Sequence, residues 1–565
     1  MWALRADAGV RRELTVPRPI LLGRSQFPSL REGGFLYVDK SLFAREVLQA
    51  PAEVLLYPRP RRFGKTLNMS MLQAFFGVGP DRSALFRDLL VWQDAATMAH
   101  FQKHPVIALS FKDVKQRAWA DARKTVDRVL TDAVCQHRPA LANPRLDPTV
   151  RARLAAVASG ESAHEAVLLD LCQALHLHHD APVVLLIDEY DAAILNGWEH
   201  GHYDEAVGCF RDLLAPVLKD NPYLFKGVLT GILRVGRESM FSGLNNVQVY
   251  SLLHTRPSEH FGFSESEVFA LLDEFDRAGE RDEVRRWYNG YRFGDAVVYN
   301  PWSIVSLLAE RPGEFRPYWL NTSGNDLVRS LLLRASGVRA AVATLIEGGA
   351  IEADIQEDVP LRELEPNNAW SLLLFAGYLR PERFWREGTR LRATLAIPNL
   401  EVRGIWEETF RRWLEQGAGS LEPLHRSILA GDAPAVQEIL GKMLLRHASF
   451  HDVAENQDEA FYHAFMLGLL VTLERTHAVR SNRETGDGRA DLLIIPKRPG
   501  LPGVVLEFKR GGGRSTLAAH ARAAVKQAVV KQYRAELEAA GAEPISVLGV
   551  AFSGKGVAVR SPARG

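Results

Sequence analysis

Two strings in the sequence combine residue types that could bind phosphate and a divalent cation. The first begins with an apolar run at 53–57 (EVLLY), passes through a short loop and reaches Gly64, Lys65 and Thr66, where we expect a helix that ends at residue 76. A loop of this kind directs backbone N–H groups and the positive end of a helix dipole at phosphate. We expect Lys65 to reach the β- and γ-phosphates of a nucleotide and the Thr66 hydroxyl to ligate Mg²⁺.

The loop departs from the usual pattern at one position. Five residues before Gly64 the pattern has a glycine, whereas this chain has Arg59, and prolines stand on both sides of that arginine. Arg62 adds a further positive charge, which could also contact phosphate. A Gly-Lys-Thr string alone is common by chance, so the assignment needs a second element.

The string 183–191 (VVLLIDEYD) supplies that element. Its apolar residues predict a buried strand that ends in Asp188 and Glu189. A carboxylate at this edge could hold Mg²⁺, and a following glutamate could polarise an attacking water. Taken alone, the string could equally be an acidic turn after a strand. Two matching strings in the expected order favour a nucleotide site.

A third strand, expected at 226–232, places Thr230 near its end and Arg234 and Arg237 just beyond it. These side chains could sense the γ-phosphate or stabilise its charge. The alternative, that the arginines are ordinary surface residues, stays open.

The second candidate site lies near the C-terminus, in the segments 486–495 (GDGRADLLII) and 503–509 (GVVLEFK). Glu507 and Lys509 share one face of a strand because side chains alternate. If the two strands pair, Asp491 and Glu507 come close enough to share a divalent cation, with Lys509 beside them. Such a cation could activate water and offset charge on a scissile phosphate. The alternative to a metal site is an edge strand whose charged side chains simply face solvent.

The helix that we expect after this string, at 515–537, is basic and carries Gln527 and Tyr533. Its positive side chains could follow a phosphate backbone over the metal site, or they could form a solvated face. The net charge of the chain is only +1, but residues 501–565 hold ten Lys or Arg and four acidic residues. A protein that is basic throughout is therefore excluded, whereas a local nucleic-acid site is not.

The order of the expected elements predicts three regions. Residues 1–290 alternate strands and helices, which is typical of an α/β domain with a parallel sheet. Residues 291–445 are expected to be mostly helical, and residues 446–565 return to strands and helices. The charged N-terminus, the absence of a long apolar run and three widely spaced cysteines favour a cytoplasmic protein without a membrane segment.

Longer strings resemble two known families. RPRRFGKTL (59–67), LLIDEYDAAI (185–194) and TGILRVGRESMFSGLNN (230–246) resemble the AAA-ATPase-like domain. SNRETGDGRADLLI (481–494), VVLEFKR (504–510) and AVKQAVVKQY (524–533) resemble the PD-(D/E)XK nuclease-like domain that accompanies it.

The resemblance implies an α/β fold with a P-loop NTPase-like parallel sheet, a helical middle region and a C-terminal restriction-endonuclease-like domain. It implies ATP and Mg²⁺ as ligands of the first domain. For the second it implies a nuclease core of Glu459, Asp491, Glu507 and Lys509, supported by Gln527 and Tyr533.

These observations predict an ATP-regulated, Mg²⁺-dependent nuclease that cleaves nucleic-acid phosphodiester bonds, with DNA favoured over RNA. A nucleotide-dependent switch that binds nucleic acid or a protein without cleaving, and an ATPase with a scaffold C-terminal domain, remain the alternatives. Whether ATP is hydrolysed or only bound, and whether the chain forms a homo-oligomer, stay open.

Overall fold

The structure is a computed structural model of the 565-residue chain. Apart from isolated positions in the gaps, it describes residues 17–235, 246–255, 258–319, 348–359, 366–418, 421–447, 476–485, 488–510, 516–530, 534–553 and 556–562. None of the described helices is both long enough and apolar enough to cross a bilayer.

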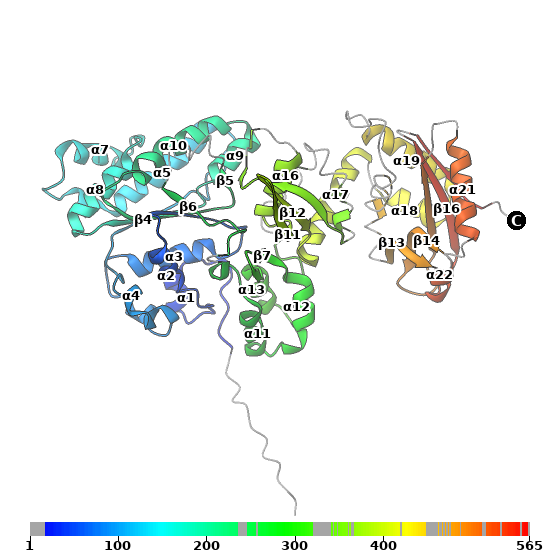
Figure 1. The fold of residues 1–565 in the computed structure, drawn as a ribbon, viewed down its shortest axis with the longest axis horizontal. Helices are drawn as coiled ribbons and strands as arrows, with labels where there is room; N and C mark the ends of the chain where they lie inside the picture. Colours follow the sequence, from blue (N-terminus) through cyan, green and yellow to red (C-terminus); the bar gives the residue numbers. More distant parts are fainter. Residues whose placement is uncertain are drawn as a thin grey trace, which may run out of the picture.

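The first region is built on a five-stranded sheet in which each paired strand runs parallel to its neighbour, in the order β2-β3-β4-β1-β6. The strands predicted at 53–57, at 183–188 and at 226–232 lie within one or two residues of β1, β3 and β4 because buried parallel strands read as continuous apolar runs. Helices lie on both sides of this sheet in Figure 1. The strands are β1 Val54–Pro58, β2 Val106–Ser110, β3 Val183–Asp188, β4 Leu224–Gly231 and β6 Val247–Val249.

Helix α3 (Lys65–Phe76) follows β1 and has the predicted bounds. Because the strands are parallel, their carboxyl ends meet at one edge of the sheet, where the loop before α3 and the end of β3 also lie. Other helices of this region are α5 (Trp119–Gln136), α8 (Val167–His179) and α10 (Tyr203–Leu218). The predicted α/β fold class is confirmed.

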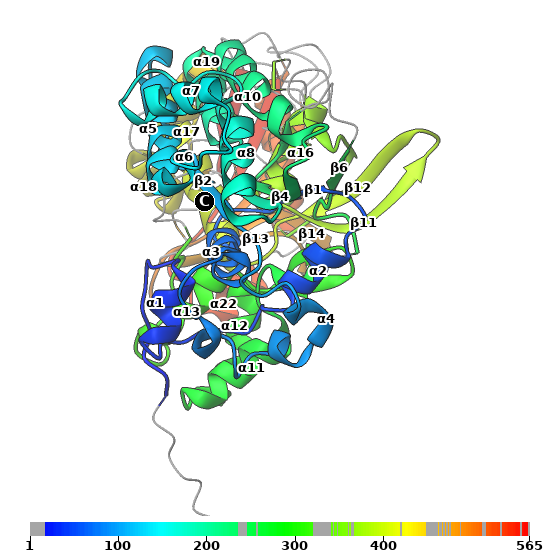
Figure 2. The same cartoon turned by 90° about the vertical axis from the view of Figure 1, so that its left-hand side faces the viewer.

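The middle region contains helices and, in addition, an antiparallel sheet that we did not predict. Its described helices include α13 (Pro301–Ala309), α16 (Pro366–Phe375) and α17 (Leu400–Ala418). The sheet has the order β11-β12-β9, and its β11–β12 hairpin projects from the body in Figure 2. Strand β11 reads RPERFWRE and is mostly exposed, so it lacks the apolar pattern by which strands are recognised. The three strands are β9 Ile351–Ile355, β11 Arg380–Glu387 and β12 Arg390–Ala396.

The C-terminal region contains a five-stranded mixed sheet in the order β13-β14-β15-β16-β17. Only the β15–β16 pair is parallel among the pairs described. Helix α21 (Leu517–Val530) contacts β15 and β16, and helix α22 (Ala535–Ala539) also falls within the range predicted as one long helix; residues 531–533 lie outside the described residues. The strands are β13 His477–Thr485, β14 Gly488–Pro496, β15 Gly503–Arg510, β16 Ile545–Ser553 and β17 Gly556–Arg560.

Two helices assigned by sequence to the middle region also pack on this sheet. Helix α18 (Glu422–Leu429) contacts β15, and α19 (Ala433–His447) contacts β17. In Figure 1 they lie on the side of the sheet away from α21. The sheet is therefore covered by helices on both faces, and its core includes Leu492, Leu506 and Leu548. The domain limits at residues 290 and 445 stay predictions.

Candidate functional site

The loop between β1 and α3 has the backbone of a phosphate cradle. Gly64, the residue before α3, has φ = 81°, and Arg62 has φ = 71°. Glycine adopts this left-handed region without cost, whereas for arginine it carries strain. The first backbone N–H groups of a helix have no acceptor within the helix, so those at the start of α3 are available to phosphate at this turn.

Lys65 is buried and bonded to the loop itself. Its Nζ donates to the carbonyl oxygens of Arg59 at 2.8 Å and of Pro60 at 2.9 Å. Burial lowers the pKa of Lys65, and the nearby carboxylates of Glu189 and Asp188 oppose that shift. The ammonium group is thus held at the centre of the cradle by oxygen atoms that an incoming phosphate could replace.

Asp188 joins the loop to the neighbouring strands. Its carboxylate accepts a hydrogen bond from Thr66 Oγ1 at 2.6 Å and another from Thr230 Oγ1 at 2.6 Å. Asp188 ends β3 and Thr230 lies near the end of β4, so parallel strand ends bring the two predicted residues to the first turn of α3. A carboxylate and a hydroxyl at this position form a hard-oxygen donor set that suits Mg²⁺.

Two acidic residues follow Asp188 and differ in role. Glu189 has φ = 52° and lines the same pocket as Lys65 and Thr66. Asp191 is buried and accepts hydrogen bonds from the backbone N–H groups of Ile232 and Leu233, both at 2.8 Å. Burial raises the pKa of Asp191 to about 6. The sequence analysis did not predict that Asp191 would fix the backbone after β4, although the string LLIDEYD contains this aspartate.

Arg59, the departure from the glycine pattern, does not obstruct the cradle. Its side chain is 0% exposed and lies 5.2 Å from the ring centres of both Phe261 and Phe293. Its Nη1 donates to the carbonyls of Pro58 at 2.8 Å and Tyr250 at 2.6 Å. Burial lowers the pKa of this guanidinium to about 10. The arginine is a core residue of the fold, and only its backbone faces Lys65.

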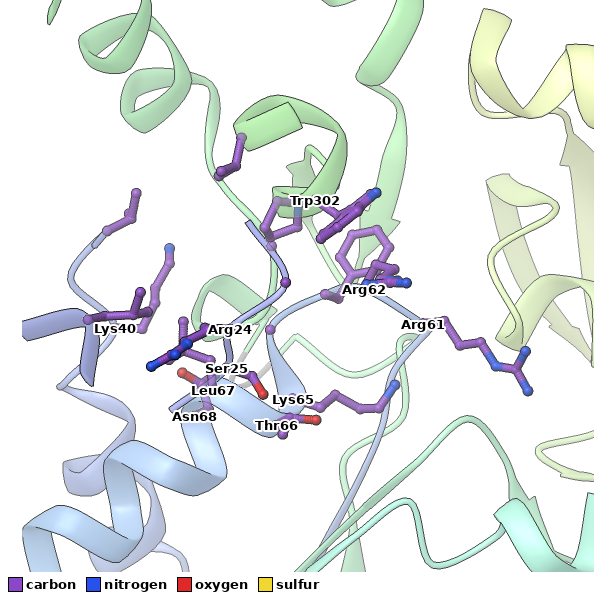
Figure 3. Close-up of a pocket in the computed structure, with 18 of the residues that line it drawn as sticks. Arg24, Ser25, Lys40, Arg61, Arg62, Lys65, Thr66, Leu67, Asn68 and Trp302 are labelled. Atoms are coloured by element: carbon purple, nitrogen blue, oxygen red, sulfur yellow. The ribbon is translucent and has the colours of Figure 1, made fainter. Parts of the chain in front are cut away.

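A pocket of about 390 Å³ opens beside the cradle. Figure 3 shows Lys65 and Thr66 at the start of α3, Arg62 lying against Trp302, and Arg61 pointing away from them. The Arg62 guanidinium is 4.2 Å from the centre of the Trp302 ring, and burial lowers its pKa. The wall opposite α3 is apolar and includes Phe263, Trp302 and Val305, so it could receive a nucleobase.

Arg234 is engaged away from this pocket. Its Nε lies 2.6 Å from Oδ1 of Asp358, and the short strand β5 (Arg234–Val235) pairs with β10 (Asp358–Val359) of the middle region. Arg234 is not one of the described residues that line the pocket. The contact of Arg234 with the γ-phosphate stays a prediction, and Arg237 lies outside the described residues.

The second site lies where β14 and β15 pair. The last paired residues of the two strands are Leu492 and Leu506, and Asp491 and Glu507 come next to them on β14 and β15. The Asp491 carboxylate accepts a hydrogen bond from the N–H of Phe508 at 2.6 Å, and the Asp491 N–H donates to Glu507 at 3.4 Å. The two predicted carboxylates are thus adjacent.

Gln527 and Lys509 complete the described part of this site. Glu507 is 1% exposed and accepts a hydrogen bond from Nε2 of Gln527 on α21. Lys509 lies two residues further along β15 and is half-buried. Glu459 and Tyr533, the other predicted members, lie outside the described residues.

The donor set at the second site fits a magnesium ion. Within the described residues no group of three or more His, Cys, Asp and Glu side chains gathers as a metal cage. Mg²⁺ commonly binds through one or two carboxylates and keeps several waters, so Asp491 and Glu507 suffice as protein ligands. The oxygen donors that remain would come from water and phosphate.

Comparisons with known proteins bear on both sites. Residues 21–241 match the family described as predicted AAA-ATPase, and residues 457–561 match the PD-(D/E)XK nuclease superfamily. An uncharacterized protein from the vnfD 5′ region of Azotobacter chroococcum is 28% identical over 549 residues, covering 94% of this chain and 96% of that protein. A solved Walker-type ATPase of Pyrococcus abyssi aligns at 15% identity with a TM-score of 0.35, over 66% of this chain and 97% of that one.

The family matches coincide with the two sites built from geometry. The first match contains the cradle and the Asp188 network, and the second contains the Asp491–Glu507 pair. Residues 21–241 of this chain therefore resemble a predicted AAA-ATPase domain, and residues 457–561 resemble a domain of the PD-(D/E)XK nuclease superfamily.

Proposed function

We propose that the chain binds ATP at the cradle and is a Mg²⁺-dependent nuclease at the C-terminal site, with nucleotide binding regulating cleavage. The observation that carries the nuclease part is the adjacency of Asp491 and Glu507, each fixed by a further hydrogen bond. The nucleotide part rests on the convergence of Lys65, Thr66 and Asp188 at the first turn of α3.

At the nucleotide site the chain's own residues bind and orient the phosphates. The Lys65 ammonium would leave its two carbonyl partners for phosphate oxygens, which carry more negative charge. Thr66 and Asp188 would hold Mg²⁺, which neutralises part of the phosphate charge when bound. Glu189, on the same pocket wall, is placed to orient a water for hydrolysis.

At the nuclease site, Asp491 and Glu507 would hold Mg²⁺, which supplies an activated water and offsets charge on the scissile phosphate. Gln527 keeps one oxygen of Glu507 in place and leaves the other toward Asp491. The Lys509 ammonium stabilises the negative charge that develops on the phosphate. Arg522 and Lys526, both exposed on α21, add positive charge for a nucleic-acid backbone.

The loop that binds nucleotide also touches the middle region, which supports regulation. A Cβ built on Gly377 would lie 2.8 Å from Cβ of Pro60, so the loop and the turn after α16 are in close contact. The rings of Phe63 and Tyr291 meet edge to face at 4.8 Å between their centres. When Lys65 leaves the carbonyls of this loop, the loop must adjust against these neighbours.

The middle region in turn contacts the nuclease sheet. Trp406 on α17 donates from Nε1 to the carbonyl of Tyr378 at 3.1 Å, next to the turn that touches the loop. Gln437 on α19 accepts hydrogen bonds from the N–H of Val559 at 3.1 Å and from Arg560 at 2.9 Å, both on β17. The middle region thus contacts both the loop and the nuclease sheet, and this shared neighbour supports the proposed regulation.

The direct test is a cleavage assay on the full chain. Plasmid DNA, a short duplex and an RNA of the same sequence are incubated with Mg²⁺ and with ATP, ADP or no nucleotide. We expect Mg²⁺-dependent cleavage of DNA whose rate changes with ATP, and its loss in Glu507→Gln. Glu538→Gln, an exposed glutamate on α22, is the matched control.

Absence of cleavage of any substrate by the wild type, with or without ATP, would contradict the nuclease assignment. Retained ATP binding in that case would favour the alternative of a nucleotide switch that binds nucleic acid or a partner without cutting it. Cleavage of RNA alone would overturn the preference for DNA. We infer a cytoplasmic location for such an enzyme, which fractionation of cells would check.

A further inference from the structure

The engagement of Arg234 by Asp358 raises the question of which cation meets the γ-phosphate. Of the positive side chains that line the pocket, several already have a fixed position. Lys40 forms an ion pair with Glu267 at 2.6 Å, and Arg62 lies on Trp302. The described cations of the pocket wall are Arg24, Lys40, Arg61, Arg62, Lys65, Lys112 and Lys115.

Lys112 and Lys115 differ from the others in where the fold holds them. They follow β2, whose last residue, Ser110, pairs with Asp188 in the sheet. The next residue, Phe111, donates its N–H to the Asp188 carbonyl at 3.1 Å. The segment that carries the lysines is therefore tied by its backbone to the residue that we assign to Mg²⁺.

The segment is also anchored by its apolar side chains. Phe111 and Val114 are fully buried, and Phe111 packs edge to face on Phe210 at 4.8 Å between ring centres. Between and after these anchors, Lys112 and Lys115 are exposed and line the pocket together with Glu189. Neither lysine forms an ion pair with a carboxylate in the part of the chain that the structure describes.

We propose that Lys112 and Lys115 bind the terminal phosphate of a nucleoside triphosphate and allow the pocket to distinguish triphosphate from diphosphate. The inference rests on the proposed nucleotide site and adds to it the residues that read the third phosphate. Two ammonium groups beside Glu189 would meet the charge that is present in ATP and missing in ADP. Asp113, exposed in the same segment and on the same wall, keeps the net charge of the segment at a single positive unit.

The test compares two ligands on one set of variants. Calorimetry in Mg²⁺ measures the affinity of the full chain for ADP and for the β,γ-imido analogue of ATP. For Lys112→Ala/Lys115→Ala we expect about tenfold weaker binding of the analogue, with ADP affinity changed less than twofold. Lys112→Arg/Lys115→Arg should retain most of the affinity for the analogue because it keeps both charges.

Lys124→Ala is the matched control, since this exposed lysine pairs with Asp121 on α5 and does not line the pocket. Equal affinities in the double alanine variant and the wild type would overturn the inference, and so would equal weakening of both ligands. If the wild type binds both ligands and the double alanine variant has the same affinities, only the role of the two lysines is refuted. A wild type that binds neither ligand refutes the nucleotide site itself.

Discussion

The two candidate sites are assembled in different ways. The nucleotide site collects residues from strand ends and loops spread between Leu21 and Val305, and its Lys65 and Thr66 are bonded within the site. The nuclease site is built from two neighbouring strands and one helix, between Asp491 and Gln527. The first depends on long-range packing, whereas the second depends on one strand register. Changes in packing should therefore affect the first site more than the second.

The largest effect is expected at the nuclease carboxylates. Glu507→Ala should lower the cleavage rate by about 10³-fold, because it removes a ligand of the activating cation and the partner of Gln527. Lys509→Ala should lower it by about 10²-fold through loss of charge stabilisation. ATP affinity, measured by calorimetry, should stay unchanged in both, because the two sites share no residues. A parallel loss of ATP binding would show that the two sites are not independent.

A somewhat smaller effect is expected at the cradle. Lys65→Ala should weaken ATP binding by about 100-fold, equal to about 2.7 kcal/mol, because the phosphates lose their central cation. Lys103→Ala, an exposed lysine outside the pocket, is the control. Titration calorimetry with ATP and Mg²⁺ provides the measurement. Unchanged affinity in Lys65→Ala would refute the assignment of the loop.

Packing behind the cradle offers a third test. A Cβ on Gly231 would lie 2.6 Å from Oδ1 of the buried Asp191, so Gly231→Ala should destabilise the first region by about 1–3 kcal/mol and also weaken ATP binding. Gly208→Ala, in α10 with open space around it, should leave stability unchanged or raise it slightly. Thermal unfolding measures both. If Gly231→Ala has the thermal stability and ATP affinity of the wild type, the first site tolerates changes in packing.

The smallest expected effect concerns pH. Glu401 on α17 accepts hydrogen bonds from Ser303 and from the N–H of Trp319, and burial raises its pKa from 4.5 to about 7. The folded protein therefore retains a proton that the unfolded chain releases, so this stabilisation is complete below the unfolded pKa and is lost as pH rises through the folded one. Asp191 acts in the same direction.

We expect the free energy of unfolding to fall by about 2 kcal/mol between about pH 5 and pH 7.5 through Glu401 alone. Glu401→Gln should flatten this dependence, whereas Glu422→Gln, an exposed residue of α18, should not. Urea titrations at several pH values provide the measurement. The same slope in Glu401→Gln and the wild type would exclude this carboxyl as the source.

Much of both sites could be predicted from sequence because they sit on strand ends. Buried parallel strands read as unbroken apolar runs, and the acidic residues that follow β3 stand out against such a run. Alternation along a strand likewise separates Glu507 and Lys509 from Phe508. Local patterns of this kind predict which residues share an edge or a face.

Other features depend on partners far away in the chain and could not be predicted. The direction of the Arg59 side chain is set by Phe261 and Phe293, about 200 residues later. The pairing of Arg234 with Asp358 joins two regions that the sequence pattern treats separately. An arginine in a loop gives no local signal of which distant ring or carboxylate it will meet.

The wall formed by α13 has a consequence for how such proteins are assembled from modules. Trp302 and Val305 border the nucleotide pocket, although they follow the region that the sequence pattern assigns to the P-loop domain. A fragment that stops at residue 290 would lack this wall and would leave Phe63 without Tyr291 and Phe293. We therefore expect an exchange of the C-terminal part to preserve the proposed nucleotide binding only when the junction lies beyond α13.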